Sequence, residues 1–183
     1  MMSLRAAVRW QRGNLLFGSY MKLLRAITAL AMTQAIKGEN MNNDHDKKMR
    51  DILVSTKTIA SVGLSSNEGK ESYGIAAYLK EQGYRIIPVN PTADEILGEK
   101  SYPDLSSIPE KVDVVQVFRK PEDVPPVVDE AIKIGAKVIW MQEGIRHEES
   151  AQKAREAGLQ VVMDACMRAT HRRLMIGPKP IVL

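Results

Sequence analysis

The sequence predicts an α/β protein with a five-stranded parallel sheet and helices on both of its faces. From residue 57 onward, short apolar runs alternate with segments whose apolar residues recur at helical spacing. The runs are continuously apolar, as expected for strands that are covered on both faces. Two of the helical segments end at a glycine, which is common at helix ends. Together these observations predict one Rossmann-like domain.

The first half of the domain is predicted from one helical pattern between two apolar runs. The helical segment has Ile75, Ala76 and Leu79 at helical spacing and ends at Gly83. A loop-rich stretch follows the second run and could include a short strand near Lys100. The predicted elements are, in order, a strand over 57–64, a helix over 72–83, a strand over 84–90 and the loop-rich stretch over 91–111.

The second half continues the alternation. Pro121, Pro125 and Pro126 crowd the start of a helical segment, where proline is tolerated because the first helical N–H groups lack partners. Gly158 closes the last helical segment. The predicted elements are a strand over 112–118, a helix over 121–135, a strand over 136–142, a helix over 148–158 and a strand over 159–164.

The amino-terminal segment differs in composition from the rest of the chain. Residues 1–38 carry six basic residues and no acidic one, so the remainder, at a whole-chain net charge of +4, carries −2. This leader fits a transit peptide, an amphipathic membrane-surface segment or a start-site artefact, and we favour the artefact because Met41 and Met49 lie just before the domain pattern. Its longest uncharged run, 26–36, is too short to cross a bilayer.

We therefore divide the chain into three parts. Residues 1–48 are predicted to be a basic leader and polar linker outside the fold, 49–177 the domain, and 178–183 a tail. The expected location is cytoplasmic, or organellar if the leader is a transit peptide. The mildly acidic domain gives no support for nucleic-acid binding, and no stable membrane insertion is expected.

The cysteine content limits the chemistry that the chain can perform. Cys166 is the only cysteine, which excludes a disulfide framework within the chain. Cys166 and His171 alone are too few ligands for a zinc site, so no metal is predicted. We interpret Cys166 as a small buried apolar residue, with a reactive thiol as the alternative.

The turn after the first predicted strand is rich in glycine and hydroxyl groups. Gly63 allows a sharp turn, Ser72 stands where a helix N-cap is expected, and Lys70 adds a positive charge. Free N–H groups at a helix start, together with the helix dipole, favour an anion. The residues fit either a phosphate cradle or an ordinary turn. Their spacing matches neither G-x-G-x-x-G nor the P-loop, and Asn90 stands where NAD binding would favour an acidic residue.

A longer stretch resembles a known family. "SVGLSSNEGKESYGIAAYLKEQGYRIIPVNPTADEILGEKSYPDLSSIPEKVDVVQVFR" and "GAKVIWMQEGIRHEESAQKAREAGLQVVMDAC" are similar to the CoA-binding protein family. These are small stand-alone relatives of the CoA-binding domain in succinyl-CoA synthetase alpha subunits and ADP-forming acyl-CoA synthetases. The resemblance covers roughly residues 52–175.

The resemblance implies that CoA, or an acyl-CoA, is the ligand. Its phosphates would lie in the turn after the first strand, its adenosine beside the end of the second strand, and its pantetheine arm along "MQEG". Arg119 could pair with a phosphate through two N–H groups. The cofactor-binding residues implied are Gly63, Ser65, Ser66, Asn67, Lys70, Ser72, Tyr73, Val89, Asn90, Pro91, Phe118, Arg119, Gln142 and Gly144.

The chain departs from the larger synthetases. His171 has no glycine-rich phosphohistidine loop around it, and Glu143, His147 and Asp164 show no pattern that pairs a base with an orienting partner. We therefore predict a CoA-binding protein without catalytic residues. The alternatives are an NAD(P)-dependent oxidoreductase or a small acyl-CoA-processing enzyme. The expected partners are a small nucleotide ligand and either a second copy of the chain or a separate synthetase subunit.

Overall fold

The computed structural model describes residues 44–179. The expectations for residues 1–43 and for the tail from 180 to 183 lie outside the described residues. The chain divides into two units, Met1–Lys47 and Lys48–Leu183, and the fold below is that of the second unit.

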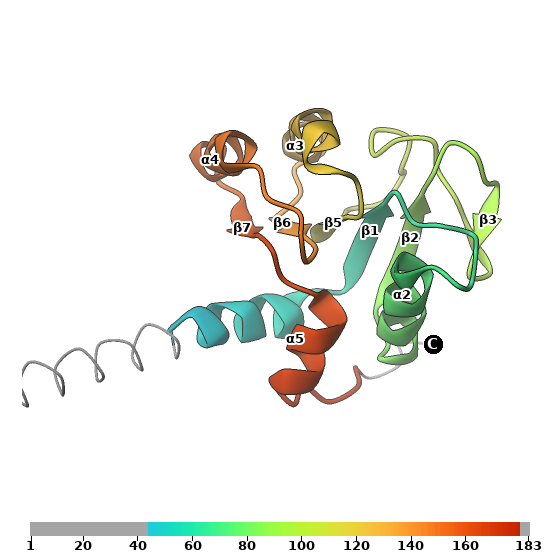
Figure 1. The fold of residues 1–183 in the computed structure, drawn as a ribbon, viewed down its shortest axis with the longest axis horizontal. Coiled ribbons are helices and arrows are strands. Elements are labelled where there is room, and N and C mark those ends of the chain that lie inside the picture. The colour runs from blue at the N-terminus through green and yellow to red at the C-terminus, as the bar shows by residue number, and fades with distance from the viewer. Residues whose placement is uncertain (1–43, 180–183) are drawn as a thin grey trace, which may run out of the picture. The chain divides into compact units, whose positions relative to one another are not determined.

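A five-stranded sheet forms the centre of this unit, and all of its strands are parallel. The strand order is β2-β1-β5-β6-β7, which is the order of one common type of doubly wound sheet (Figure 1). The five predicted strands are thus confirmed, each shorter than its apolar run. Their bounds are β1 Thr58–Val62, β2 Arg85–Val89, β5 Val114–Val117, β6 Val138–Met141 and β7 Gln160–Val162.

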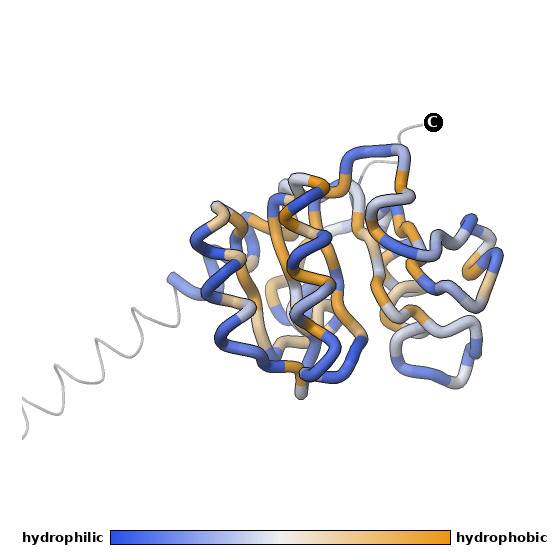
Figure 2. Tube along the Cα trace, turned by 90° about the horizontal axis from the view of Figure 1, so that it is seen from above, coloured by the Kyte–Doolittle hydropathy of each residue, from blue (hydrophilic) through white to orange (hydrophobic). Residues whose placement is uncertain are grey.

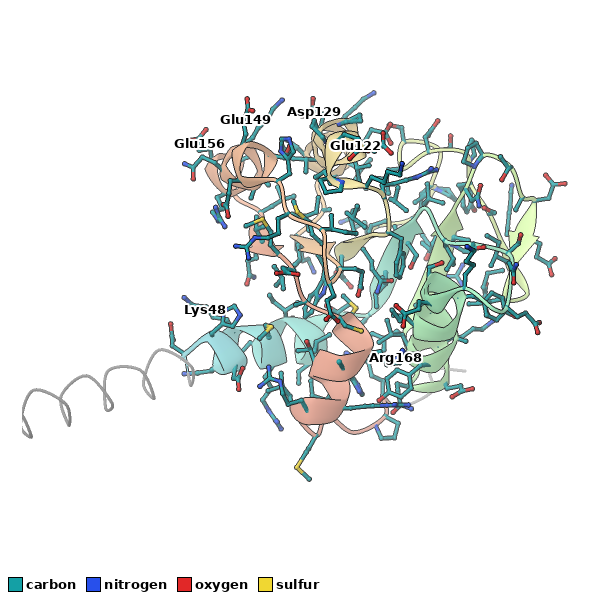
Figure 3. The ribbon with its side chains drawn as sticks, in the orientation of Figure 1. Lys48, Glu122, Asp129, Glu149, Glu156 and Arg168 are labelled. Atoms are coloured by element: carbon teal, nitrogen blue, oxygen red, sulfur yellow. The ribbon has the colours of Figure 1, made fainter. Side chains whose placement is uncertain are left out.

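Helices cover both faces of the sheet, which confirms the predicted fold class. On one face lie α3 (Val124–Lys133), which follows a 3-10 turn over Pro121–Asp123, and α4 (Glu148–Glu156). On the other face lie α2 (Glu71–Glu81) and α5 (Met167–Arg173). Figure 2 shows hydrophobic residues along the strands and hydrophilic ones along much of α4. Charged side chains such as Asp129 on α3 and Glu149 on α4 project away from the sheet (Figure 3).

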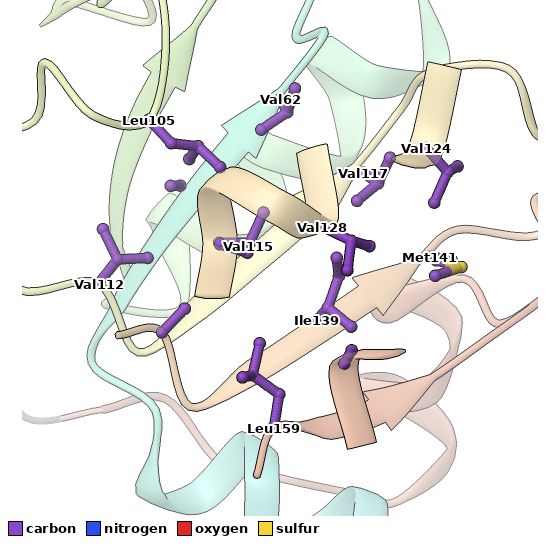
Figure 4. Packing of buried hydrophobic residues seen from close by; sticks show 14 of the residues in the cluster. Val62, Leu105, Val112, Val115, Val117, Val124, Val128, Ile139, Met141 and Leu159 are labelled. Atoms are coloured by element: carbon purple, nitrogen blue, oxygen red, sulfur yellow. The ribbon is translucent and has the colours of Figure 1, made fainter. Parts of the chain in front are cut away.

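The strand side chains alternate between two apolar clusters. Val115, Val117 and Ile139 pack with Val128 of α3 on one face (Figure 4). The other cluster contains the fully buried Trp140 and the apolar residues of α2. Since both clusters are closed by helices, the ends of the strands are left as the accessible parts of the sheet.

A small antiparallel hairpin lies in the loop-rich stretch. Its strands are β3 (Glu95–Ile96) and β4 (Glu99–Lys100), joined through Leu97 and Gly98, which both have positive φ values. This confirms the short strand expected near Lys100. Tyr102 then pairs with Val89, so the hairpin returns the chain to the end of β2.

Two helical segments differ from the prediction. Residues 44–55 are helical although 44–48 were expected to belong to the linker, and Met49, Ile52 and Leu53 are buried in the α2-side cluster. The helix α5 was not predicted. Apart from the segments that the structure leaves undescribed, no helix has the length and apolar content needed to span a membrane.

Candidate functional site

The strands β1 and β5 are neighbours in the sheet, and the strand order reverses between them. In doubly wound sheets, ligands bind beyond the carboxyl ends of the strands at such a switch point. Here these ends are Val62 and Val117, and they are followed by Gly63 and Phe118. The Phe118 N–H donates to the Val62 carbonyl over 2.9 Å, so the two chain segments leave the sheet side by side.

Gly63 and Arg119 meet at the switch point. Gly63 has a φ of +80°, in the left-handed region that favours glycine. A Cβ atom at this position would lie 3.0 Å from Nε and 3.1 Å from Cδ of Arg119. The missing side chain of Gly63 thus makes the space through which Arg119 passes. No hydrogen bond or ion pair joins the Arg119 guanidinium to any residue that the structure describes, so its donors are available to a ligand.

The turn between β1 and α2 is held by its own polar groups. The Ser65 N–H donates to Ser72 Oγ (3.2 Å), the Asn67 N–H to Ser65 Oγ (3.1 Å), and the Gly69 N–H to Asn67 Oδ1 (2.8 Å). A hydroxyl that accepts a hydrogen bond still has its own proton to donate. Ser65 and Ser72 therefore fix the shape of the turn and keep one donor each.

The predicted N-cap role of Ser72 is wrong. The helix α2 begins at Glu71, and its N-cap is Lys70, whose side chain makes no capping hydrogen bond. Ser72 lies in the first helical turn, where its hydroxyl accepts from Ser65 instead of capping the helix. The first N–H groups of a helix have no intrahelical acceptor, so this helix start offers donors and a positive dipole end to an anion. Lys70 is exposed and forms no ion pair with a described residue, so its positive charge adds to that of the helix start.

The end of β2 is joined to the same turn. The Gly63 N–H donates to the Val89 carbonyl (2.9 Å), and Asn90 Nδ2 donates to the Leu64 carbonyl (2.8 Å). Asn90 Oδ1 accepts from the N–H and the hydroxyl of Thr92. Asn90 therefore has a structural role that sequence reasoning did not identify: it connects two of the turns that surround the switch point.

Two cavities flank these turns. The first, of about 280 Å³, lies on the α3 side and is lined by Val62, Val89, Pro91, Leu105, Arg119 and Pro126 among others. The second, of about 420 Å³, lies on the α2–α5 side and is lined by Ile75, Phe118, Gln142, Glu143, Cys166 and Arg168 among others. Because Phe118 and Arg119 are adjacent in sequence, the end of β5 contributes to both cavities.

Gln142 contributes a buried polar group to the second cavity. Its side chain is only 4% exposed, and its Oε1 accepts from the Met167 N–H (3.2 Å). Its Nε2 is buried without a hydrogen-bond partner among the described residues. A buried donor without an acceptor is costly, so this amide fits a ligand that brings a carbonyl oxygen.

The structure brings together most of the predicted site residues but not all. Val89, Pro91 and Arg119 line the first cavity, and Phe118 and Gln142 line the second. The turn residues Ser66 and Asn67 are exposed, Tyr73 donates to Glu68 at 3.3 Å, and neither cavity includes them.

Gly144 lies in a tight turn rather than in a cavity wall. Its φ is +79°, and its N–H donates to Asp164 Oδ1 over 2.7 Å. Its backbone amide therefore already has an acceptor.

Three of the four residues that were considered as acids or bases have other contacts, whereas Glu143 is exposed and lines the second cavity. His147 caps α4 by accepting from the Ser150 N–H, and Asp164 binds Gly144 and Arg146. His171 is buried under α2, with Nδ1 3.0 Å from the Tyr78 hydroxyl. Burial, and next the nearby Lys179 ammonium, lower the pKa of His171. No three His, Cys, Asp or Glu side chains gather as metal ligands within residues 44–179.

Two residues of the second cavity were not among the predicted binding residues. Cys166 lines this cavity and packs beside the α2-side cluster, so its apolar surroundings agree with the interpretation, but it is partly exposed and not fully buried. Arg168 extends from α5 toward α2 and lies 3.9 Å from Glu71 Oε1 (Figure 3). Arg168 could not be assigned from sequence because the helix α5 itself was not predicted.

Comparisons with known proteins show the family to which this chain belongs. A family model described as a CoA binding domain matches residues 57–172. The uncharacterized protein YneT of Bacillus subtilis is 40% identical over 131 residues, which cover 72% of this chain and 97% of YneT. A solved structure of a hypothetical protein from Pyrococcus horikoshii OT3 is 43% identical with a TM-score of 0.69, and the match covers 71% of this chain and 92% of that one.

Larger enzymes contain a similar segment. The ADP-forming acetate–CoA ligase II of Archaeoglobus fulgidus is 34% identical over 111 residues, which make up 59% of this chain but only 16% of the ligase. This chain therefore corresponds to one small part of that relative.

Proposed function

Because the chain belongs to the CoA binding domain family, we propose that it binds CoA or an acyl-CoA across the switch point of its sheet. The ligand consists of an adenosine part, a diphosphate and a pantetheine arm. The two cavities and the turn between them provide three adjacent regions of matching chemistry.

The adenosine part is assigned to the first cavity. Val89 and Pro91 form apolar walls there, beside the end of β2. The pantetheine arm is assigned to the second cavity, where Phe118 and Ile75 supply apolar surface and Gln142 supplies a buried donor. Amide carbonyls of the arm are suitable acceptors for this donor.

The diphosphate is assigned to the region between the cavities. The observation that carries the proposal is the close approach of Gly63 and Arg119, because it directs an unpaired guanidinium to the place where β1 and β5 diverge. The start of α2 and the exposed Lys70 add N–H donors and a second positive charge on the same side. Charge-assisted hydrogen bonds of this kind are the strong ones in anion recognition.

The test is a titration with CoA, acetyl-CoA, NAD and ATP, each followed by the melting temperature and by calorimetry. We expect stabilisation by CoA or acetyl-CoA, of about 2.7 kcal/mol at a hundredfold excess over Kd. Lys70→Ala and Arg119→Ala should weaken binding. The matched controls, Lys111→Ala and Arg155→Ala, remove exposed charges before β5 and at the end of α4, away from the switch point, and should bind normally.

A response to NAD alone would contradict the proposal and would favour an oxidoreductase. Equal losses in the site variants and in the controls would show that only the net charge matters. Two archaeal relatives are named as alpha subunits of acetate–CoA ligases, which supports the expectation that a separate synthetase subunit is a partner. Copurification with such a subunit would test that expectation.

A further inference from the structure

The position of Cys166 is fixed by hydrogen bonds on both of its sides. The preceding residue, Ala165, donates its N–H to the Met141 carbonyl (3.3 Å) and accepts from Trp140 Nε1 (2.7 Å). The following residue, Met167, donates its N–H to Gln142 Oε1 (3.2 Å). Three hydrogen bonds thus connect the chain around Cys166 to the carboxyl end of β6 and to Gln142, the residue that follows this strand.

The thiol is accessible from the second cavity. Cys166 is partly exposed and lines the cavity together with Phe118, Gln142 and Arg168. It makes no disulfide, since it is the only cysteine of the chain. A buried thiol is generally inert, whereas a thiol at a cavity wall can meet a bound reactant.

A second, independent observation indicates that a ligand occupies this cavity. Gln142 is 4% exposed, and its Nε2 has no hydrogen-bond partner among the described residues. Its Oε1 is held by Met167, so the amide is oriented by the same segment that carries Cys166. An acceptor that comes close to Nε2 therefore also comes close to the chain that bears the thiol.

We propose that Cys166 is a thiol-exchange site, which forms a mixed disulfide by exchange with the disulfide of a pantetheine-type ligand bound in the second cavity. This inference rests on the proposed function, because the nucleotide part must direct the ligand to this cavity. In a pantetheine arm an amide carbonyl lies a few bonds from the sulfur. When that carbonyl accepts from Gln142 Nε2, the ligand sulfur is held in the cavity that Cys166 also lines.

The reaction is an exchange with the symmetric disulfide of the ligand. The Cys166 thiolate attacks one sulfur of that disulfide, an S–S bond forms to the protein, and the original S–S bond breaks. The second sulfur leaves as a thiolate and takes a proton from water. Cys166 is oxidised, one ligand sulfur is reduced, and no other oxidant is needed. A reducing thiol reverses the step.

The experiment measures adduct formation by intact mass after incubation of the full chain with CoA disulfide. Oxidised glutathione at the same concentration is the control reactant, because it lacks the nucleotide. We expect one CoA adduct, formed at least about tenfold faster than the glutathione adduct because a bound reactant has a high effective concentration. Excess ADP or CoA should slow the reaction, and dithiothreitol should remove the adduct.

The control variant is Cys166→Ser, which keeps the size of the side chain. It should form no adduct, and calorimetry should still detect reversible binding of CoA. Equal rates with both disulfides would overturn the proposal, because they would show an ordinary exposed thiol. Normal CoA binding without any adduct would overturn it as well, while the proposed function would stand. Failure of both wild type and Cys166→Ser to bind CoA would refute the proposed function itself.

Discussion

Replacement of Gly63 by alanine tests how the switch point is built. The residue has a φ of +80°, and an added Cβ would lie 3.0 Å from Nε and 3.1 Å from Cδ of Arg119. We expect two separate consequences. The left-handed backbone conformation costs an L residue about 1–2 kcal/mol, which lowers the free energy of unfolding. The Cβ atom also displaces the Arg119 side chain, which lowers the affinity for CoA.

The loss of affinity can be estimated from the contact that is displaced. A hydrogen bond from a charged guanidinium contributes about 1.5–3 kcal/mol. The dissociation constant of CoA should therefore rise about 10- to 100-fold in Gly63→Ala, since each 1.4 kcal/mol or so is a factor of ten. Isothermal titration calorimetry at fixed ionic strength measures this change, and chemical denaturation measures the loss of stability.

Variants at two other glycines separate the effect of backbone strain from the effect of the contact with Arg119. Gly135 and Gly158 have φ values of +69° and +90°, and a Cβ at either would meet nothing within 4 Å. Gly135→Ala and Gly158→Ala should lose similar stability and keep the affinity for CoA. In a chain that already carries Arg119→Ala, the additional substitution Gly63→Ala should weaken CoA binding only slightly more. If Gly63→Ala binds CoA as tightly as the Gly135 control, the assigned role of Arg119 is refuted.

Two further predictions concern the α2-side cluster. Tyr84→Phe should lower the free energy of unfolding by about 1–2 kcal/mol, because the buried Tyr84 hydroxyl donates to the Leu53 carbonyl over 2.9 Å. Chemical denaturation should show no such loss in the control Tyr102→Phe. Equal losses in the two variants would contradict a stabilising role for the Tyr84 hydrogen bond. The pKa of His171 is lowered from its ordinary 6.5, mainly by burial and also by Lys179, so the unfolded chain binds the proton more strongly. The contribution of neutral His171 to stability is therefore complete above about pH 6.5 and is lost as the pH falls below that value. His171→Gln should make the free energy of unfolding depend less steeply on pH between about pH 6.5 and 5, by at most about 1.4 kcal/mol per pH unit. The same pH dependence in His171→Gln and wild type would refute this role of His171.

Most of the fold could be predicted from sequence because its signals are local. The five strands are runs of apolar residues, and α2 and α4 end near glycines. The helix α5 gave a weak signal since two of its three buried residues, Thr170 and His171, are polar. In the helix of residues 44–55, the spacing of Met49, Ile52 and Leu53 was the available signal, but charged neighbours suggested a linker.

The site was predictable only in part, because its geometry depends on contacts across the sheet. The turn at Gly63 was found from its position after a strand and Arg119 from the family resemblance, whereas their direct contact depends on the strand order. Ser72 was given the wrong role because its partner, the Ser65 N–H, lies across the turn. Cys166 reaches the second cavity through bonds of its neighbours to β6, which no local pattern encodes.

The most direct test of the central claim is a crystal structure of the protein grown with CoA. We predict that the diphosphate lies beyond β1 and β5, within hydrogen-bond distance of the Arg119 guanidinium and the first N–H groups of α2. The pantetheine arm should then extend into the cavity lined by Phe118 and Gln142. A diphosphate bound at the opposite edge of the sheet, or away from Arg119, would contradict the account.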